Sequence, residues 1–198
     1  MVVKTGFAYA AAFAATVALF SLGGASPASA QAHAHAEGRS EAPQEGARKL
    51  RNGFWIGFGF GGGLSSQGSV LSDGQRGGAA YFRLGGTVNQ HVLFGGEAQV
   101  WWRETSPGSD LERVNVTATA LVYPSVTRGL FFKGGFGVGS VEQLPGASST
   151  GIGTTLGIGY DFRLGNNFYI TPNLDFLVQF LENSTPSSLL FTLGATWH

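Results

Sequence analysis

The C-terminal stretch Leu189-Leu-Phe-Thr-Leu-Gly-Ala-Thr-Trp-His198 alternates between large apolar side chains and small or polar ones. One face carries Leu189, Phe191, Leu193, Ala195 and Trp197. The other face carries Leu190, Thr192, Gly194, Thr196 and His198. A period of two residues with one apolar face is typical of a β-strand that lies between two different environments. The stretch therefore predicts a strand, and the remaining sequence has to decide which environment each face meets.

Seven further alternating runs begin after Gly53, and turn residues separate them. The runs cover residues 54–60, 79–88, 92–105, 113–123, 130–141, 152–164 and 168–181. The longer connections, rich in Gly, Ser and Pro, cover 64–78, 106–112, 144–151 and 183–188. They alternate with tight turns, which predicts an antiparallel meander of eight strands with its longer loops facing outward from the cell. Pro172 lies within a run, and because proline cannot donate a ladder hydrogen bond, we expect a bulge or an unpaired site there.

The composition favours lipid rather than water around the predicted strands. Only 12% of the 198 residues are charged, and 12 basic residues balance 12 acidic ones. A soluble barrel of the lipocalin type has the same period with its apolar face inside, but it needs charges along its outward positions. Those positions here would be mostly Gly, Thr, Asn and Gln. We therefore expect an all-β, eight-stranded, antiparallel up-and-down transmembrane β-barrel whose apolar face looks outward.

Two sets of residues mark the two predicted faces. Charges of both signs on the polar face are expected to pair in the lumen, because an unpaired buried charge carries a heavy desolvation penalty. They are Arg83, Glu97, Arg103, Lys133, Asp161, Arg163 and Asp175. Aromatic residues toward the strand ends of the apolar face are candidates for the two interfacial girdles of a membrane barrel. They are Phe54, Trp102, Phe162, Phe168, Phe180 and Trp197.

The N-terminal quarter of the chain lacks the alternating pattern, and its first residues predict export from the cytoplasm. Lys4 precedes an apolar segment that reaches about Leu22, and Ala28-Ser29-Ala30 matches a cleavage site, so residues 1–30 are interpreted as a signal peptide cut after Ala30. A single membrane-spanning anchor is the alternative, although the apolar core is short for a span of about 20 residues. Residues 31–52 carry no apolar period and predict a disordered periplasmic tail. Its His33-x-His35 pair could capture a metal weakly, but a solvated tail is the simpler interpretation.

With its strand pattern, its glycine- and aromatic-rich strands, its export signal and its alternating last strand, the sequence resembles the small outer-membrane β-barrel family of Gram-negative bacteria. The resemblance is to barrels in the style of the OmpA membrane domain and OmpX, and it covers Gly53 to His198. It implies outer-membrane lipid as the surroundings. In that family the last strand commonly ends in an aromatic residue that the assembly machinery reads. The resemblance thus implies that Leu189–His198 meets the barrel assembly machinery, although Trp197 here is followed by His198.

Specific chemistry is scarce in the sequence. Gly57-x-Gly59-x-x-Gly62 matches a dinucleotide fingerprint, but that motif requires a following helix, and a Ser/Gly loop follows here. The zero net charge gives no reason to expect nucleic-acid binding, and the absence of cysteine excludes a disulfide scaffold and a thiolate metal site. We therefore expect no cofactor and no metal, and we expect a monomer.

Three functions are open for such a barrel. A structural or surface-interaction role without enzymatic activity is the prediction. A narrow, porin-like channel is the first alternative, because the predicted lumen is charged. An enzyme that modifies lipid A is the second, but a nucleophile there needs a base at the outer rim. The four histidines (His33, His35, His91 and His198) fall in the predicted tail or at the predicted periplasmic end.

Overall fold

The computed structural model describes residues 51–67, 73–106, 109–144, 146 and 148–198. The predicted signal peptide, nearly all of the predicted tail and the His33/His35 pair lie outside the described residues. The strands are β1 (Phe54–Ser66), β2 (Gln75–Asn89), β3 (Val92–Ser106), β4 (Ser109–Val122), β5 (Leu130–Leu144), β6 (Ser148–Tyr160), β7 (Phe162–Arg163), β8 (Phe168–Phe180) and β9 (Ser187–Trp197).

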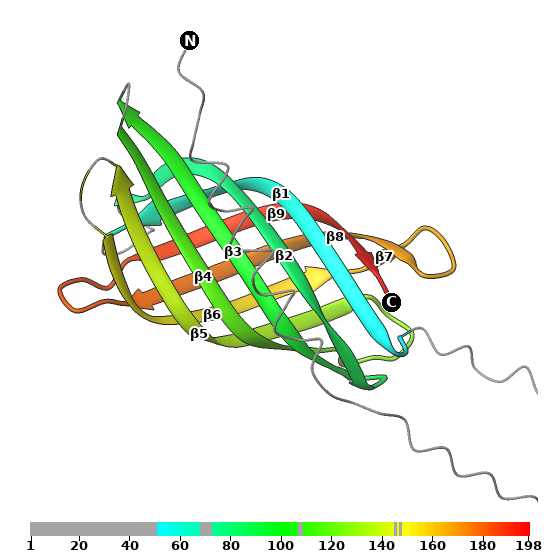
Figure 1. The fold of residues 1–198 in the computed structure, drawn as a ribbon. Coiled ribbons are helices and arrows are strands. Elements are labelled where there is room, and N and C mark those ends of the chain that lie inside the picture. Colours follow the sequence, from blue (N-terminus) through cyan, green and yellow to red (C-terminus); the bar gives the residue numbers. More distant parts are fainter. Residues whose placement is uncertain (1–50, 68–72, 107–108, 145, 147) are drawn as a thin grey trace, which may run out of the picture. The chain divides into compact units, whose positions relative to one another are not determined.

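The strands form one closed antiparallel barrel (Figure 1). Each strand pairs with its neighbour along the chain, and β1 closes the sheet by pairing with β9. The two-residue β7 continues β6 beyond Asp161, and both pair with β8. The wall therefore has eight strand positions, which confirms the predicted fold class. Closure by β1 and β9 pairs the two terminal strands with each other, which removes the open edges that a flat sheet would have.

The closing seam joins the stretch 189–198 to the first strand, as the alternation predicts. The register runs from Ile56 opposite Trp197 to Ser66 opposite Ser187. Both ends of the barrel segment consequently lie at one end of the barrel, with the tight connections at 90–91, 123–129 and 164–167. We call this the short-turn end. The opposite end, with the connections at 67–74, 107–108, 145–147 and 181–186, is called the loop end.

At the loop end the strands are longer than the alternating runs, so the predicted loops were too wide. The segments predicted as loops at 106–112 and 144–151 lie largely in strands, mainly β4 and β6. About half of the segment 64–78 lies in β1 and β2, and β9 begins at Ser187. The alternation fades there because Gly and Ser replace the large apolar residues. Ladder hydrogen bonds do not need an apolar face, so the hairpins continue as strands beyond the apolar belt.

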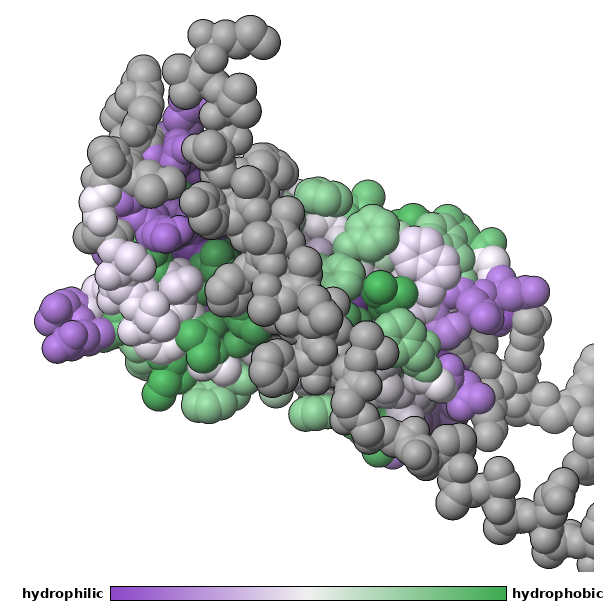
Figure 2. Space-filling view, viewed as in Figure 1, coloured by the Kyte–Doolittle hydropathy of each residue, from purple (hydrophilic) through white to green (hydrophobic). Residues whose placement is uncertain are grey.

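Large apolar side chains cover the outside of the wall. Phe60, Leu156 and Phe191 are more than 60% exposed, and they belong to three different strands. Figure 2 shows such side chains in green on the visible parts of the wall, with hydrophilic ones in purple toward the ends. A water-soluble domain rarely exposes so continuous an apolar surface. The predicted apolar-out arrangement is thus confirmed. Within the described residues, no helix is long and apolar enough to cross a membrane.

Candidate functional site: the sealed lumen

The interior of the barrel has three layers, because a cluster of buried apolar side chains lies on each side of a polar middle. The layer at the short-turn end consists of Trp55, Leu93, Leu121, Tyr123 and Phe131. The layer at the loop end consists of Ala79, Trp101, Leu177 and Leu190, with Leu111 packed against them. These layers were not predicted, although the sequence carries a signal for them. Trp101 and Leu190 are large apolar residues on the otherwise polar face of their strands.

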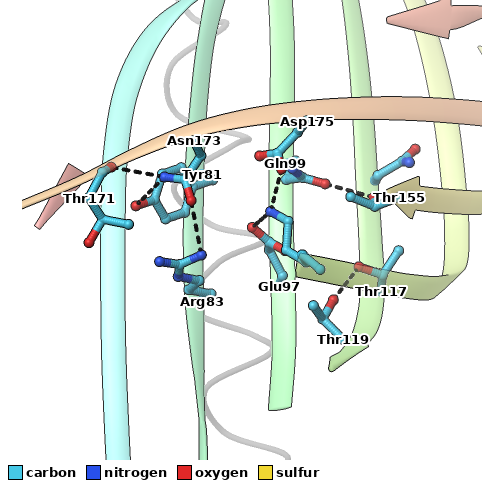
Figure 3. A network of polar contacts seen from close by, with 12 residues as sticks. Tyr81, Arg83, Glu97, Gln99, Thr117, Thr119, Thr155, Thr171, Asn173 and Asp175 are labelled. Carbon is cyan, nitrogen blue, oxygen red and sulfur yellow. Dashed lines mark hydrogen bonds and ion pairs between the residues drawn. The ribbon is translucent and has the colours of Figure 1, made fainter. Parts of the chain in front are cut away.

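Lys133 is the centre of the polar layer. Its Nζ lies 2.6 Å from Glu97 Oε1 and 2.9 Å from Asp175 Oδ1, and all three side chains are buried. Figure 3 shows Glu97 and Asp175 converging from different strands, with Gln99 between them. Gln99 Nε2 donates to Asp175 Oδ2 at 3.0 Å, and Thr155 Oγ1 donates to Gln99 Oε1 at 2.8 Å. One cation thus neutralises parts of two carboxylates.

A glycine makes room for this ion cluster. Gly157 stands opposite Lys133 on one side and opposite Asp175 on the other. A Cβ atom at Gly157 would overlap Asp175 Oδ1 and would lie 3.0 Å from Lys133 Cε. The absence of a side chain at this position therefore allows the charged groups from β5 and β8 to meet over β6.

Arg83 is fully buried but forms no ion pair with a carboxylate among the described residues, contrary to the expected pairing of opposite charges. It faces Glu97 in the β2–β3 register, yet Glu97 is taken by Lys133. Arg83 instead donates to Asn173 Oδ1 at 3.3 Å and to Thr196 Oγ1 at 3.2 Å. Its guanidinium carbon also lies 5.0 Å from the Tyr81 ring centroid and within cation–π range of two more rings. Ring faces and neutral acceptors thus replace the expected salt bridge.

Asp161 joins the short-turn end of the lumen to the C-terminus. It lies at the interruption between β6 and β7, where its carboxylate accepts hydrogen bonds from the Tyr123 hydroxyl at 2.7 Å and the Thr171 hydroxyl at 2.8 Å. His198 Nε2 lies 3.3 Å from the same carboxylate. The residue after Trp197 therefore turns into the barrel, in keeping with the alternation of the last strand.

Arg51 packs against Tyr123 at the short-turn end of the lumen, although the sequence predicted that it belongs to a disordered tail. It is 1% exposed, and its guanidinium lies 3.5 Å from the centroid of the Tyr123 ring. Its Nη2 atom donates to the carbonyl of Arg128 at 2.8 Å. A single basic residue before the first alternating run carries no periodic signal. The burial of Arg51 could not be predicted, because its partners lie in the 123–129 connection, far away in the sequence.

Two predicted lumen charges lie outside the polar layer. Arg163 is exposed and caps the adjacent turn, donating to the carbonyls of Gly165 at 2.8 Å and Asn166 at 3.0 Å. Arg103 is partly buried toward the loop end of β3. A third arginine that was not predicted, Arg113, is buried and donates to the carbonyl of Ser66 at 2.8 Å. Alternation assigns a face but not a depth, so it could not separate the lumen from its two mouths.

The predicted girdle aromatics lie on the outer surface. Phe54, Phe162 and Phe180 are more than half exposed, Trp197 is 38% exposed, and Trp102 and Phe168 are partly buried. Trp197 packs against Phe168, with ring centroids 4.9 Å apart. Phe54, Phe162, Phe168 and Trp197 lie at the short-turn end, whereas Trp102 and Phe180 lie toward the loop end. Aromatic side chains thus lie at both ends of the apolar belt.

A group of carboxylates lies beyond the belt at the loop end. Glu112 stands opposite Glu142, and Asp110 stands opposite Glu104, along β3, β4 and β5. The apolar positions of β4 begin only at Val114, so this group is outside the membrane-spanning segment. Partial burial raises the pKa of Glu112 above its ordinary value, and the neighbouring charges of Glu142 and Asp110 raise it further.

This raised pKa predicts that Glu112 destabilises the folded barrel at neutral pH. Because the folded state binds the proton more tightly than the unfolded state, the penalty should decline as the pH falls below the folded-state pKa and vanish below the lower, unfolded-state pKa. We expect Glu112→Gln to melt at a higher temperature than the wild type at pH 7, with the difference shrinking in mild acid. Thermal unfolding in detergent measures this. Glu182→Gln, at an exposed acid of the 181–186 connection, is the control; an equal gain from both variants would refute the explanation.

No group of three or more His, Cys, Asp or Glu side chains could hold a metal ion within the part of the chain that the structure describes. The closed antiparallel wall, the apolar outside and the filled, hydrogen-bonded lumen instead define a class: the eight-stranded transmembrane barrel of small outer-membrane proteins.

Solved structures agree with this class. The chain resembles Neisserial surface protein A, with a TM-score of 0.57 and 16% identity, over 73% of this chain and 96% of that one. It also resembles Ail, the attachment invasion locus protein of Yersinia pestis, with a TM-score of 0.51 and 18% identity, over 74% of this chain and 98% of that one. At these identities the likeness establishes the fold. No protein-family model and no curated protein matches the sequence.

Proposed function

We propose that the chain is an exported outer-membrane protein with a sealed, non-enzymatic barrel and a structural or surface-interaction role. The observation that carries this proposal is the closure of the lumen by apolar side chains on both sides of the polar layer. A continuous ion pathway would have to pass between Trp55 and Phe131 at one level and between Trp101 and Leu190 at another. Constrictions lined by apolar side chains oppose the passage of hydrated ions.

The export route and the orientation belong to the same proposal. Small outer-membrane barrels have short turns on the periplasmic side and longer loops outside. The short-turn end would thus face the periplasm, and the hairpins at the loop end would face the surroundings of the cell. The carboxylates of Glu104, Asp110, Glu112 and Glu142 would then be displayed beyond the outer leaflet, which supports a surface-interaction role.

The distribution of histidine supports the absence of Ser–His chemistry at the outer rim. Among the described residues, His91 and His198 both lie at the short-turn end. Two buried serines of the loop end contact each other and the backbone. Ser65 Oγ lies 2.5 Å from Ser188 Oγ and donates to the carbonyl of Ser187.

One preparation tests this proposal with two measurements. We expect the protein in the outer-membrane fraction, with a gel mobility that changes on heating, and we expect the purified barrel to give no stable conductance steps in a planar bilayer. Arg83→Ala and Glu97→Ala serve as probes, because both alter the polar layer but leave the two apolar layers in place. Stable, salt-dependent steps from the wild type would instead support the channel alternative, and turnover of lipid A would support the enzyme.

A further inference from the structure

The wall of the barrel has a gap in its hydrogen-bond ladder beside Pro172. β6 pairs with β8 as far as Gly159 opposite Asn173, and β7 resumes with Phe162 opposite Ile170 in the same register. Continuing that register would place Tyr160 opposite Pro172, but the pairing is interrupted there. On the other side of β8 the ladder with β9 runs through Pro172 without a break. The expected irregularity at Pro172 is therefore an unpaired site on one side of the strand.

The gap leaves a backbone acceptor without its ladder donor. The backbone N–H of Asp161 donates to the carbonyl of Gly129 on the β5 side at 2.9 Å. Successive residues of a strand direct their backbone N–H and C=O groups to opposite neighbours, so those of Tyr160 point toward β8. Opposite them stands Pro172, which has no N–H group. On the lumen side the bond from the Thr171 hydroxyl to the Asp161 carboxylate bridges the gap. No comparable bridge from a described side chain reaches the carbonyl of Tyr160 on the lipid side.

A hollow covers this gap on the outer surface. It has a volume of about 260 Å³ and is lined mainly by apolar side chains. They include Leu130, Ile158, Tyr160, Pro172, Leu174 and Phe191. Tyr160 packs against the girdle residue Phe162, with ring centroids 4.6 Å apart. The hollow thus lies toward the short-turn end of the apolar belt, beside a predicted girdle aromatic.

We propose that this hollow binds an ethanolamine phospholipid of the periplasmic leaflet. Its acyl chain would pack against the apolar lining, and its ammonium group would donate a hydrogen bond to the carbonyl of Tyr160. An unsatisfied backbone carbonyl is unfavourable in lipid, and an ammonium group supplies the missing donor. A choline phospholipid has the same chains and phosphate but no N–H group. The inference rests on the membrane location and orientation proposed above.

The test compares wild type and Pro172→Val in nanodiscs that differ only in the lipid headgroup. The headgroups are ethanolamine, its N-methyl and N,N-dimethyl derivatives, and choline, so that the N–H donors are removed one at a time. We expect the wild type to melt a few degrees lower in choline lipid than in the other three, because N,N-dimethylethanolamine still carries one donor. Valine restores a backbone N–H opposite Tyr160, so Pro172→Val should show no such drop.

Two controls make the test decisive. Leu156→Val alters an exposed apolar residue of β6 outside the hollow and should keep the headgroup preference of the wild type. If Pro172→Val does not fold, Pro172→Ala takes its place, because alanine also restores the backbone N–H group. The comparison of the four headgroups on the wild type does not depend on either variant. Equal melting in all four lipids, or a preference that persists after Pro172 is replaced, would overturn the inference. Heat-modifiable mobility in each nanodisc reports insertion separately, so a barrel that fails to insert counts against the proposed function instead.

Discussion

Gly194→Ala should prevent proper closure of the barrel seam. Gly194 of β9 stands opposite Gly59 of β1, and the Tyr81 ring from β2 lies over both. A Cβ at Gly194 would overlap the Tyr81 hydroxyl and approach the carbonyl oxygen of Phe58 to 2.5 Å. Because one of these obstacles is backbone, the strand itself would have to move. We expect a loss of about 3 kcal/mol in the free energy of unfolding, near the upper end for overpacking.

The role of Tyr81 explains why the effect should be large. Its hydroxyl accepts a hydrogen bond from Asn173 Nδ2 of β8 at 3.2 Å, so one side chain links β2 to β8 across the closing seam. Displacing the ring would therefore disturb four neighbouring strands and the cation–π contact with Arg83. Assembly would suffer as well, since the seam is where the barrel closes.

The measurement is thermal or denaturant unfolding in detergent, together with the fraction of protein that shows heat-modifiable mobility. Gly96→Ala is the matched control, because Gly96 is also a strand glycine but a Cβ there would meet nothing within 4 Å. Its effect should stay within about 0.5 kcal/mol. Equal losses from the two variants would show that alanine acts through general strand propensity and that the contact with Tyr81 is irrelevant.

Lys133→Met should produce the second large effect. Without the ammonium group, Glu97 and Asp175 would be two buried carboxylates in one site, with no cation within ion-pair distance among the described residues. Removing one partner of a buried ion pair typically costs about 3–5 kcal/mol. We expect a loss of that size in the free energy of unfolding, visible as a lower melting temperature in detergent.

The rescue variant separates electrostatics from packing. Adding Glu97→Gln and Asp175→Asn to Lys133→Met removes both uncompensated charges while keeping side-chain shapes, so it should recover most of the loss. Arg128→Met, at an exposed cation of the 123–129 turn, should have almost no effect. If the triple variant is no more stable than Lys133→Met alone, lost packing around the lysine stem would explain the destabilisation better.

Much of the wall was predictable from the sequence because alternation reports directly on the two faces of a strand. Leu189–His198 shows this most clearly: Phe191, Leu193 and Trp197 of its apolar face are exposed, Thr192 and Thr196 are buried, and its partner is β1. Strand ends were less predictable. Gly and Ser positions such as Gly62 and Ser65 carry no apolar signal, yet the ladder continues through them.

Local periodicity and the chemistry of single residues were enough to predict the class of fold, the outward face and the irregularity at Pro172. The filling of the interior, by contrast, depends on contacts that form only in the closed barrel. The tertiary structure brought Lys133 between carboxylates of β3 and β8, left Arg83 to neutral acceptors, and turned His198 in toward Asp161. The physical reason is that lumen contacts join strands far apart in the chain, and their depth depends on the register and tilt of the closed barrel.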